Sequence, residues 1–219
     1  RKIIRAGDGS LMTCMAFRAG KSRKLVALRS TDRGKTWRYH STIAFDLSNR
    51  AVSSEGFNET SLLALRDGKI LTFMRSGASY TASLGSMDDK ESDAEPPFGY
   101  KKQTPLYSSV SADGGKTWSN ADPVAPFGVW PDSVLLANGI ISVTYGRPGN
   151  WIMFSRDEAK TWVPVLQFYN DLYPPDCGNY FTSVEVAPNI LLVAYARTDP
   201  NDRWKSDIVG TYFQVKRTK

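Results

Sequence analysis

The 219-residue sequence predicts an all-β protein, and three observations support this prediction. An eight-residue phrase, Ser-x-Asp-x-Gly-Lys-Thr-Trp, occurs at 30–37, at 111–118 and, with Ala159 in place of glycine, at 155–162. Short apolar runs alternate with turn pairs such as Asp67-Gly68 and Asn138-Gly139. The 17 glycines, 12 prolines and 12% aromatic residues also suit a fold of many strands joined by tight turns.

Each copy of the phrase predicts a tight hairpin. It follows an apolar run, at 25–28, 106–110 or 151–154, and we expect the next strand to begin at its tryptophan. The aspartate side chain can accept backbone N–H groups within the turn, while the glycine supplies a positive φ. The threonine favours extended backbone, and the tryptophan covers the hairpin with apolar surface. Because Ala159 replaces the glycine, we expect the third turn to be strained or of another type.

The apolar runs form four units of one plan, at about 1–46, 51–124, 125–169 and 170–219. In the first unit the expected strands are 2–6, 11–18, 24–29 and one that begins at Trp37. The second unit has strands 60–66 and 70–75 and two that flank the second phrase, and the third has 132–137 and 140–147 and two that flank the third phrase. The strands of the fourth unit are 182–187, 190–197 and 207–215.

The spacing of these units predicts a β-propeller of four-stranded blades. The phrase tryptophans lie 81 (118 − 37) and 44 (162 − 118) residues apart, and the longer gap contains a 30-residue insertion from Ser76 to Pro105. Without it the gap is 51 (81 − 30) residues. Propeller blades repeat every 40 to 50 residues or so.

Composition excludes several classes of function. No apolar run reaches 18 residues, so we expect no transmembrane helix. Cys14 and Cys177 are too few for a disulfide framework or a metal cluster, and the single His40 argues against a zinc or Ser-His site. We expect no cofactor. The net charge of +6 favours an acidic partner, but the scattered lysines and arginines argue against nucleic acid.

The repeated phrase resembles the Asp box of the sialidase, or BNR-repeat, family of β-propellers. Members of that family have six blades, so the resemblance implies about two further blades upstream of Arg1, which this chain would need as a partner. A four-bladed ring closed by its own N-terminus is the alternative. The resemblance also implies a secreted or periplasmic protein, with the Asp boxes on the face opposite the ligand.

In a propeller the first strand of each blade leaves the ligand face and the second returns to it. The second strands of the four units end at equivalent arginines, namely Arg18, Arg75, Arg147 and Arg197. A guanidinium group binds a carboxylate through two parallel hydrogen bonds, so a mouth ringed by arginines suits an anionic ligand. For Arg18 and Arg197 we prefer the simpler interpretation that each side chain points into solvent.

Two segments resemble the sialidase site more closely. In residues 56–75, Glu59 opens one strand and Arg75 closes the next. The resemblance implies that Glu59 assists a tyrosine nucleophile and that Arg75 belongs to an arginine triad gripping the substrate carboxylate. The stretch from Tyr145 to Gly149 resembles the next arginine segment and makes Arg147 the last triad member. The first triad arginine and the acid aspartate of the family have no counterpart in this sequence.

The sequence does not decide which residue would be the nucleophile. The family pattern is Tyr-Ser-x-Leu, and strict spacing from Val184 lands on Phe181 rather than on a tyrosine. Tyr180 lies one residue earlier, and adjacent strand residues point to opposite faces. A bulge at 178–179 would turn Tyr180 into the site as the nucleophile. Without one, Tyr180 is a packing or binding residue.

The resemblance implies a retaining exo-glycoside hydrolase that acts on an anionic terminal sugar such as sialic acid. A catalytically silent carbohydrate-binding propeller and a protein-binding propeller are the alternatives. The insertion from Ser76 to Pro105 leaves the end of a second strand, so we expect it either to cover the mouth or to make no contact with ligand. Trp130 is a candidate for stacking on a sugar face.

Overall fold

The computed structural model describes residues 2–19, 22–45, 56–76, 105–146, 149–169, 180–199 and 202–217. Within these ranges the regular structure is all β, without a helix. No described segment is a helix long and apolar enough to cross a membrane. The chain divides into two compact units with a border between Val129 and Trp130, and β1 to β8 belong to the first unit.

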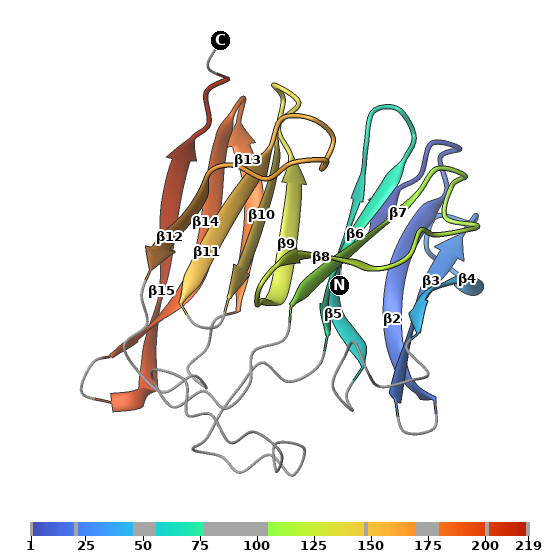
Figure 1. Cartoon of the computed structure of the whole chain (residues 1–219), viewed down its shortest axis with the longest axis horizontal. Helices are drawn as coiled ribbons and strands as arrows, with labels where there is room; N and C mark the ends of the chain where they lie inside the picture. Colours follow the sequence, from blue (N-terminus) through green and yellow to red (C-terminus); the bar gives the residue numbers. More distant parts are fainter. Residues whose placement is uncertain are drawn as a thin grey trace. The chain divides into compact units, whose positions relative to one another are not determined.

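The first unit contains two antiparallel four-stranded sheets whose strands follow chain order, drawn from blue to green in Figure 1. The first sheet is β1 (Ile4–Arg5), β2 (Leu11–Ala19), β3 (Ser22–Ser30) and β4 (Arg38–Phe45). The second is β5 (Phe57–Ala64), β6 (Ile70–Ser76), β7 (Leu106–Ser111) and β8 (Asp122–Ala125). The turn between β5 and β6 uses Gly68 at φ 87°, as the Asp67-Gly68 pair predicted.

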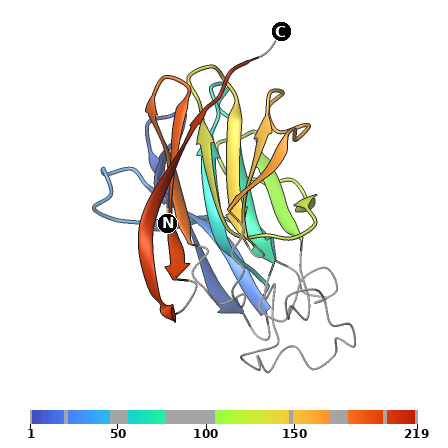
Figure 2. The ribbon, with the colours of Figure 1, turned by 90° about the vertical axis from the view of Figure 1, so that its left-hand side faces the viewer.

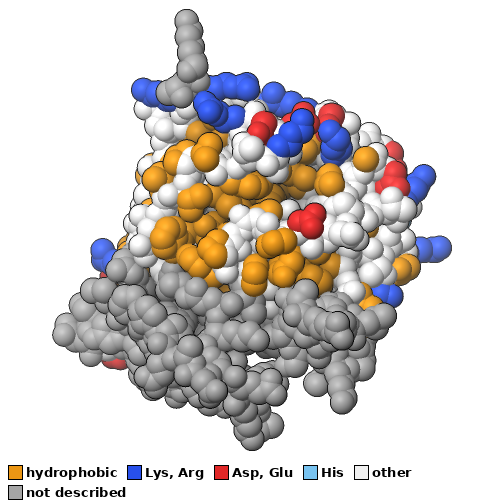
Figure 3. Space-filling view, viewed as in Figure 1, with side chains coloured by type: hydrophobic (Ala, Val, Ile, Leu, Met, Phe, Trp, Pro, Cys, Tyr) orange, Lys and Arg blue, Asp and Glu red, His pale blue; other side chains and the backbone are white. Residues whose placement is uncertain are grey.

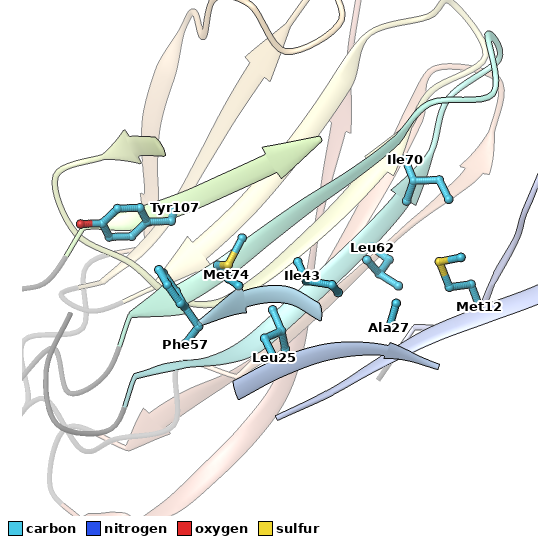
Figure 4. Close-up of a cluster of buried hydrophobic side chains, with 10 residues drawn as sticks. Met12, Leu25, Ala27, Ile43, Phe57, Leu62, Ile70, Met74 and Tyr107 are labelled. Atoms are coloured by element: carbon cyan, nitrogen blue, oxygen red, sulfur yellow. The ribbon is translucent and has the colours of Figure 1, made fainter. Parts of the chain in front are cut away.

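Apolar side chains from both sheets form the core of the first unit (Figure 4). Strand β6 is buried along its whole length, which fits its apolar sequence Ile-Leu-Thr-Phe-Met-Arg-Ser. The rings of Phe57 and Tyr107 meet edge to face, with centroids 5.4 Å apart. The buried cluster consists of Met12, Leu25, Ala27, Ile43, Ala44, Phe57, Leu62, Ile70, Met74 and Tyr107.

The second unit contains one four-stranded and one three-stranded antiparallel sheet. The first of these comprises β9 (Val129–Leu135), β10 (Ile141–Gly146), β11 (Asn150–Ser155) and β12 (Val165–Tyr169). The second comprises β13 (Phe181–Ala187), β14 (Ile190–Asp199) and the long β15 (Asp202–Gln214), which is the dark red strand of Figure 2.

Polar side chains fasten the two sheets of the second unit at their hairpin turns. The Oε1 atom of Glu185 accepts the backbone N–H groups of Ala137 at 2.8 Å and Asn189 at 2.7 Å. The Asn189 side chain in turn accepts the N–H of Asn138 at 2.8 Å. The turns after β9 and β13 therefore lie side by side.

The three repeated phrases form what we call the repeat turns, and their serine and aspartate side chains make the same four hydrogen bonds in each. In the first, Thr36 donates its backbone N–H to Asp32 Oδ1 at 2.9 Å and its hydroxyl to Oδ2 at 2.6 Å. The Ser30 hydroxyl donates to Asp32 and accepts the N–H of Gly34. The third repeat turn keeps this pattern, with Ala159 donating to Ser155 at 2.9 Å and having φ 70°. Its turn is therefore strained, not of another type.

The strands after the repeat turns begin later than the sequence predicted. We expected them to begin at Trp37, Trp118 and Trp162, whereas β4, β8 and β12 begin at Arg38, Asp122 and Val165. The tryptophans belong to the turns. Trp118 shows why, since its indole N–H donates to Ser41 Oγ at 2.9 Å and to Gly115 O at 3.2 Å, which holds its side chain against the turn.

Replacing Ala159 with glycine should stabilise the second unit by about 1 kcal/mol, because left-handed backbone costs a residue with a Cβ roughly that amount. Urea unfolding of the variant and the parent protein measures this difference. Gly115→Ala is the reverse control, since Gly115 has φ +83° and an added Cβ would come 2.6 Å from Met12 Cε. An Ala159→Gly variant no more stable than the parent would contradict strain at this turn.

The repeat turns should also make stability fall in acid. The Thr36 hydrogen bonds are the largest cause that lowers the pKa of Asp32 to about 2, and Thr161 does the same for Asp157, also to about 2. A carboxyl with a lowered folded-state pKa adds stability above its unfolded pKa of about 4. That stability is lost as the pH falls from about 4 to about 2.

Urea midpoints measured between pH 5 and pH 2 test this expectation. In Thr36→Val with Thr161→Val, the hydroxyl bonds to both carboxylates are lost, so the midpoint should depend less steeply on pH. An unchanged pH dependence in the double variant would mean that other carboxyls cause the acid sensitivity.

Candidate functional site

A β-bulge at the start of the β5–β6 hairpin positions the first pair of candidate residues. Phe57 pairs with Ser76 and Thr60 pairs with Met74, so Asn58 and Glu59 together oppose the single residue Arg75. The Asn58 side chain stabilises this irregular backbone by accepting the N–H of Glu59 at 2.8 Å and donating to Gly56 O at 3.3 Å. Bulges of this kind redirect side chains at the ends of sheets.

The bulge brings Glu59 and Arg75 into an ion pair. Arg75 Nη1 donates to Glu59 Oε1 at 3.0 Å, and the side chains of Arg75 and Glu59 are only 10% and 14% exposed. Removing either partner of such a pair destabilises the protein strongly, because the other charge is then left buried and uncompensated. The segment 56–75, chosen from sequence alone, therefore holds a preformed carboxylate and guanidinium in contact.

This ion pair lies in a pocket of about 400 Å³ within the first unit. A volume of this size suits a small ligand such as one sugar ring. The pocket contains residues that the sequence did not single out as site residues, among them Cys14, Arg23 and Thr60. Its described lining residues are Cys14, Ala16, Arg23, Leu25, Asn58, Glu59, Thr60 and Arg75.

Strand register places the pocket away from the second repeat turn. Arg75 pairs with Leu106 on the neighbouring strand β7, whereas Ile70 pairs with Ser111, the first residue of that turn. Five residues of strand span about 17 Å. The repeat turn therefore lies at the opposite end of the same sheet from Glu59 and Arg75, as expected of a structural element.

The other three strand-end arginines are not placed in this pocket by the described residues. Arg147 lies outside the described residues, so its role as a triad member stays a prediction. Arg18 is the last residue but one of β2, and its side chain is not described. Arg197 is exposed and pairs with Asp207 at 3.3 Å, in keeping with its interpretation as a solvent-facing residue. Of the insertion from Ser76 to Pro105, residues 77–104 lie outside the described residues.

Tyr180 belongs to the second unit, where it stacks on Trp130. The two rings meet edge to face with centroids 4.0 Å apart, and Tyr180 is 48% exposed. Trp130 has φ 51°, a strained backbone conformation for a bulky residue, and strain of this kind clusters at functional sites. The two aromatic residues named by the sequence are therefore in contact and partly open to solvent.

Phe181, which strict spacing would place at the nucleophile position, is only 4% exposed. It starts β13 opposite Tyr195. Asp132 fixes this end of the strand, because its buried Oδ2 atom accepts the Ser183 backbone N–H at 2.6 Å and the Ser183 hydroxyl at 2.9 Å. Residues 178–179, where the expected bulge would lie, are outside the described residues.

A larger groove of about 620 Å³ lies in the second unit, beside the third repeat turn. Its walls are mostly apolar, including the exposed Val163 and Leu166 of the β12 region, and Figure 3 shows hydrophobic side chains at the surface on the side of β12. Its described lining contains Arg156 and Lys216 but no carboxylate that could act as an acid or base. The chemistry therefore favours the smaller pocket. Among the described residues, no cluster could hold a metal ion.

No family model matches the chain, and no curated protein sequence matches it. Solved structures do resemble it. A Dyadobacter fermentans protein of unknown function is 20% identical with a TM-score of 0.76, over 98% of this chain and 52% of that chain. The Hadza microbial sialidase Hz136 is 17% identical with a TM-score of 0.60, over 97% of this chain and 43% of that one.

An α-L-arabinofuranosidase of Fusarium graminearum is 15% identical with a TM-score of 0.64, over 97% of this chain and 61% of that one. The chain therefore spans about half the length of the structures that it resembles. At these identities the similarity shows the fold alone. The all-β prediction is confirmed, with successive antiparallel sheets like those of β-propeller glycoside hydrolases. Closure of a six-bladed ring stays a prediction.

Proposed function

We propose that this protein is a sialidase-like exo-glycoside hydrolase that acts on an anionic terminal sugar such as sialic acid. The observation that carries the proposal is the buried Glu59–Arg75 pair, which lies in a sugar-sized pocket away from the repeat turn. A carboxylate that can move a proton and a guanidinium that can bind a carboxylate are the two groups that this reaction requires.

The roles follow from the chemistry of the substrate. Sialic acid carries a carboxylate on the carbon under attack, so a carboxylate nucleophile would be repelled. A tyrosine avoids this repulsion, and sialidases use one in place of the second carboxylate of other glycosidases. In the proposal Glu59 takes the Tyr180 phenol proton and the phenolate oxygen bonds to the anomeric carbon. The leaving oxygen keeps the bonding electron pair and takes a proton from an acid that this sequence does not identify.

Arg75, and Arg147 with it, would hold the substrate carboxylate, and Trp130 would stack on the sugar beside Tyr180. Because the similar solved structures are about twice as long as this chain, we propose that the full site needs further blades of the same propeller. Those blades would supply the acid and the first triad arginine.

A catalytically silent carbohydrate-binding propeller is the second candidate. The observation that favours it is Phe181, a residue that cannot attack a substrate yet occupies the position that strict spacing assigns to the nucleophile. Glu59 favours the enzyme, because a buried carboxylate beside the binding arginine would only weaken the binding of an anionic sugar.

The test is hydrolysis of a fluorogenic α-sialoside by the full-length protein, with an arabinofuranoside and a galactoside of the same fluorophore as neutral controls. We expect release from the sialoside, with an α-configured first product seen by NMR because the mechanism retains configuration. Binding of sialic acid without release would establish the silent lectin. Release from a neutral substrate alone would exclude an anionic sugar.

A further inference from the structure

Arg23 is a pocket residue for which the proposed function has no role. It lies near the start of β3, in the hairpin that follows β2, and its exposed side chain lines the pocket that holds Glu59 and Arg75. It does not end a second strand, so the strand-end pattern of arginines did not include it. Among the described lining residues, Arg23 and Arg75 are the cations and Glu59 is the carboxylate.

The charge balance of the pocket makes Arg23 important. Arg75 donates one N–H to Glu59 at 3.0 Å, so the two opposite charges largely cancel for a ligand approaching from the pocket. A substrate carboxylate that approaches Arg75 also comes close to the Glu59 carboxylate, which repels it. The ion pair by itself therefore favours an anion less than an arginine without a neighbouring carboxylate would.

We infer that Arg23 is the residue that makes this pocket select an anionic sugar, an inference that rests on the proposed function. Among the described lining residues, its guanidinium adds the positive charge that Glu59 does not cancel. A sugar carboxylate that approaches Arg75 and reaches the Arg23 guanidinium would receive charge-assisted hydrogen bonds from Arg23 as well. The ion pair then orients the ligand, while Arg23 makes the pocket prefer a negatively charged ligand.

The next residue provides a matched control. Lys24 carries the same charge, but adjacent strand residues point to opposite faces of a sheet. Its Nζ atom lies over the Tyr39 ring, 5.8 Å from the ring centroid, and it does not line the pocket. Arg23→Gln and Lys24→Gln therefore lower the net charge equally and at neighbouring positions, but only the first change alters the pocket.

Calorimetric titration of the full-length protein with N-acetylneuraminic acid and with its methyl ester tests the inference. The two probes share the sugar and differ in charge and by the one methyl group of the ester. We expect the parent protein to prefer the acid, and Arg23→Gln to weaken acid binding by about tenfold or more while ester binding changes less than about twofold. Lys24→Gln should leave both affinities within about twofold, and added salt should weaken acid binding less in Arg23→Gln than in the parent.

Each other result has a definite meaning. If Arg23→Gln weakens the acid and the ester equally, or affects the acid no more than Lys24→Gln does, Arg23 does not select charge. The parent's preference for the acid would then still support the proposed function. If the parent shows no preference for the acid over the ester, both the proposed function and the role of Arg23 are wrong.

Discussion

Alanine in place of Arg75 should weaken the binding of an acidic sugar by about 2 to 5 kcal/mol, the range found when one partner of a buried charge pair is truncated. Two effects add. The ligand carboxylate loses a charge-assisted donor, and the Glu59 carboxylate, now without the Nη1 donor at 3.0 Å, repels the incoming anion. Titration of the variant with sialic acid measures the loss. Unchanged affinity would remove Arg75 from the site even if the fold is right.

The variant needs a control for folding, because removing one partner of a buried pair also destabilises the protein. The double variant Glu59→Gln with Arg75→Ala removes the uncompensated negative charge of Glu59, so it should recover much of the stability lost in Arg75→Ala. It should not recover sialic acid binding, because the guanidinium is still absent. Recovery of binding in the double variant would mean that Arg75 serves only to neutralise Glu59.

Local sequence predicted the strands and turns of this fold well. The repeat turns are the clearest case, because the hydrogen bonds that their serine and aspartate side chains form within each turn join residues at most four positions apart, as from Asp32 to Thr36. Such contacts depend on the phrase itself and not on the rest of the fold. The phrase could not show where the next strand begins, since that depends on packing such as the Trp118 contact with Ser41 from the neighbouring sheet.

The site was predictable only in part. Family resemblance named Glu59 and Arg75, and the structure brings them together through a bulge that no simple alternation reveals. We expected the strand to begin at residue 60, but β5 begins at Phe57 because the bulge lies inside the strand. Arg23 was missed because its place in the pocket depends on how two sheets pack, and a single arginine in a basic hairpin has no signature in the sequence.

Asp132 was missed for the same reason. The sequence placed it at the start of a strand, as one more polar residue before an apolar run. In the structure it is buried and holds the start of β13 through Ser183, 51 positions away in the chain. This contact sets the position of the strand that follows Tyr180, the residue on which the choice between enzyme and lectin depends.

Phenylalanine in place of Tyr180 should reduce turnover of a sialoside by roughly a thousandfold or more while sialic acid affinity stays within about twofold, because the change removes only the attacking oxygen. The ring can keep its edge-to-face contact with Trp130, and the Asp132 bonds to Ser183 are untouched, so folding stability should change little. Steady-state kinetics, titration and urea unfolding separate these three quantities.

Tyr212→Phe is the matched control, since Tyr212 is also exposed but lies on β15. If the Tyr180→Phe protein retains full turnover, the nucleophile is another residue. If the parent protein binds sialic acid without turnover and Tyr180→Phe binds equally well, Tyr180 is a binding tyrosine and the protein is the lectin.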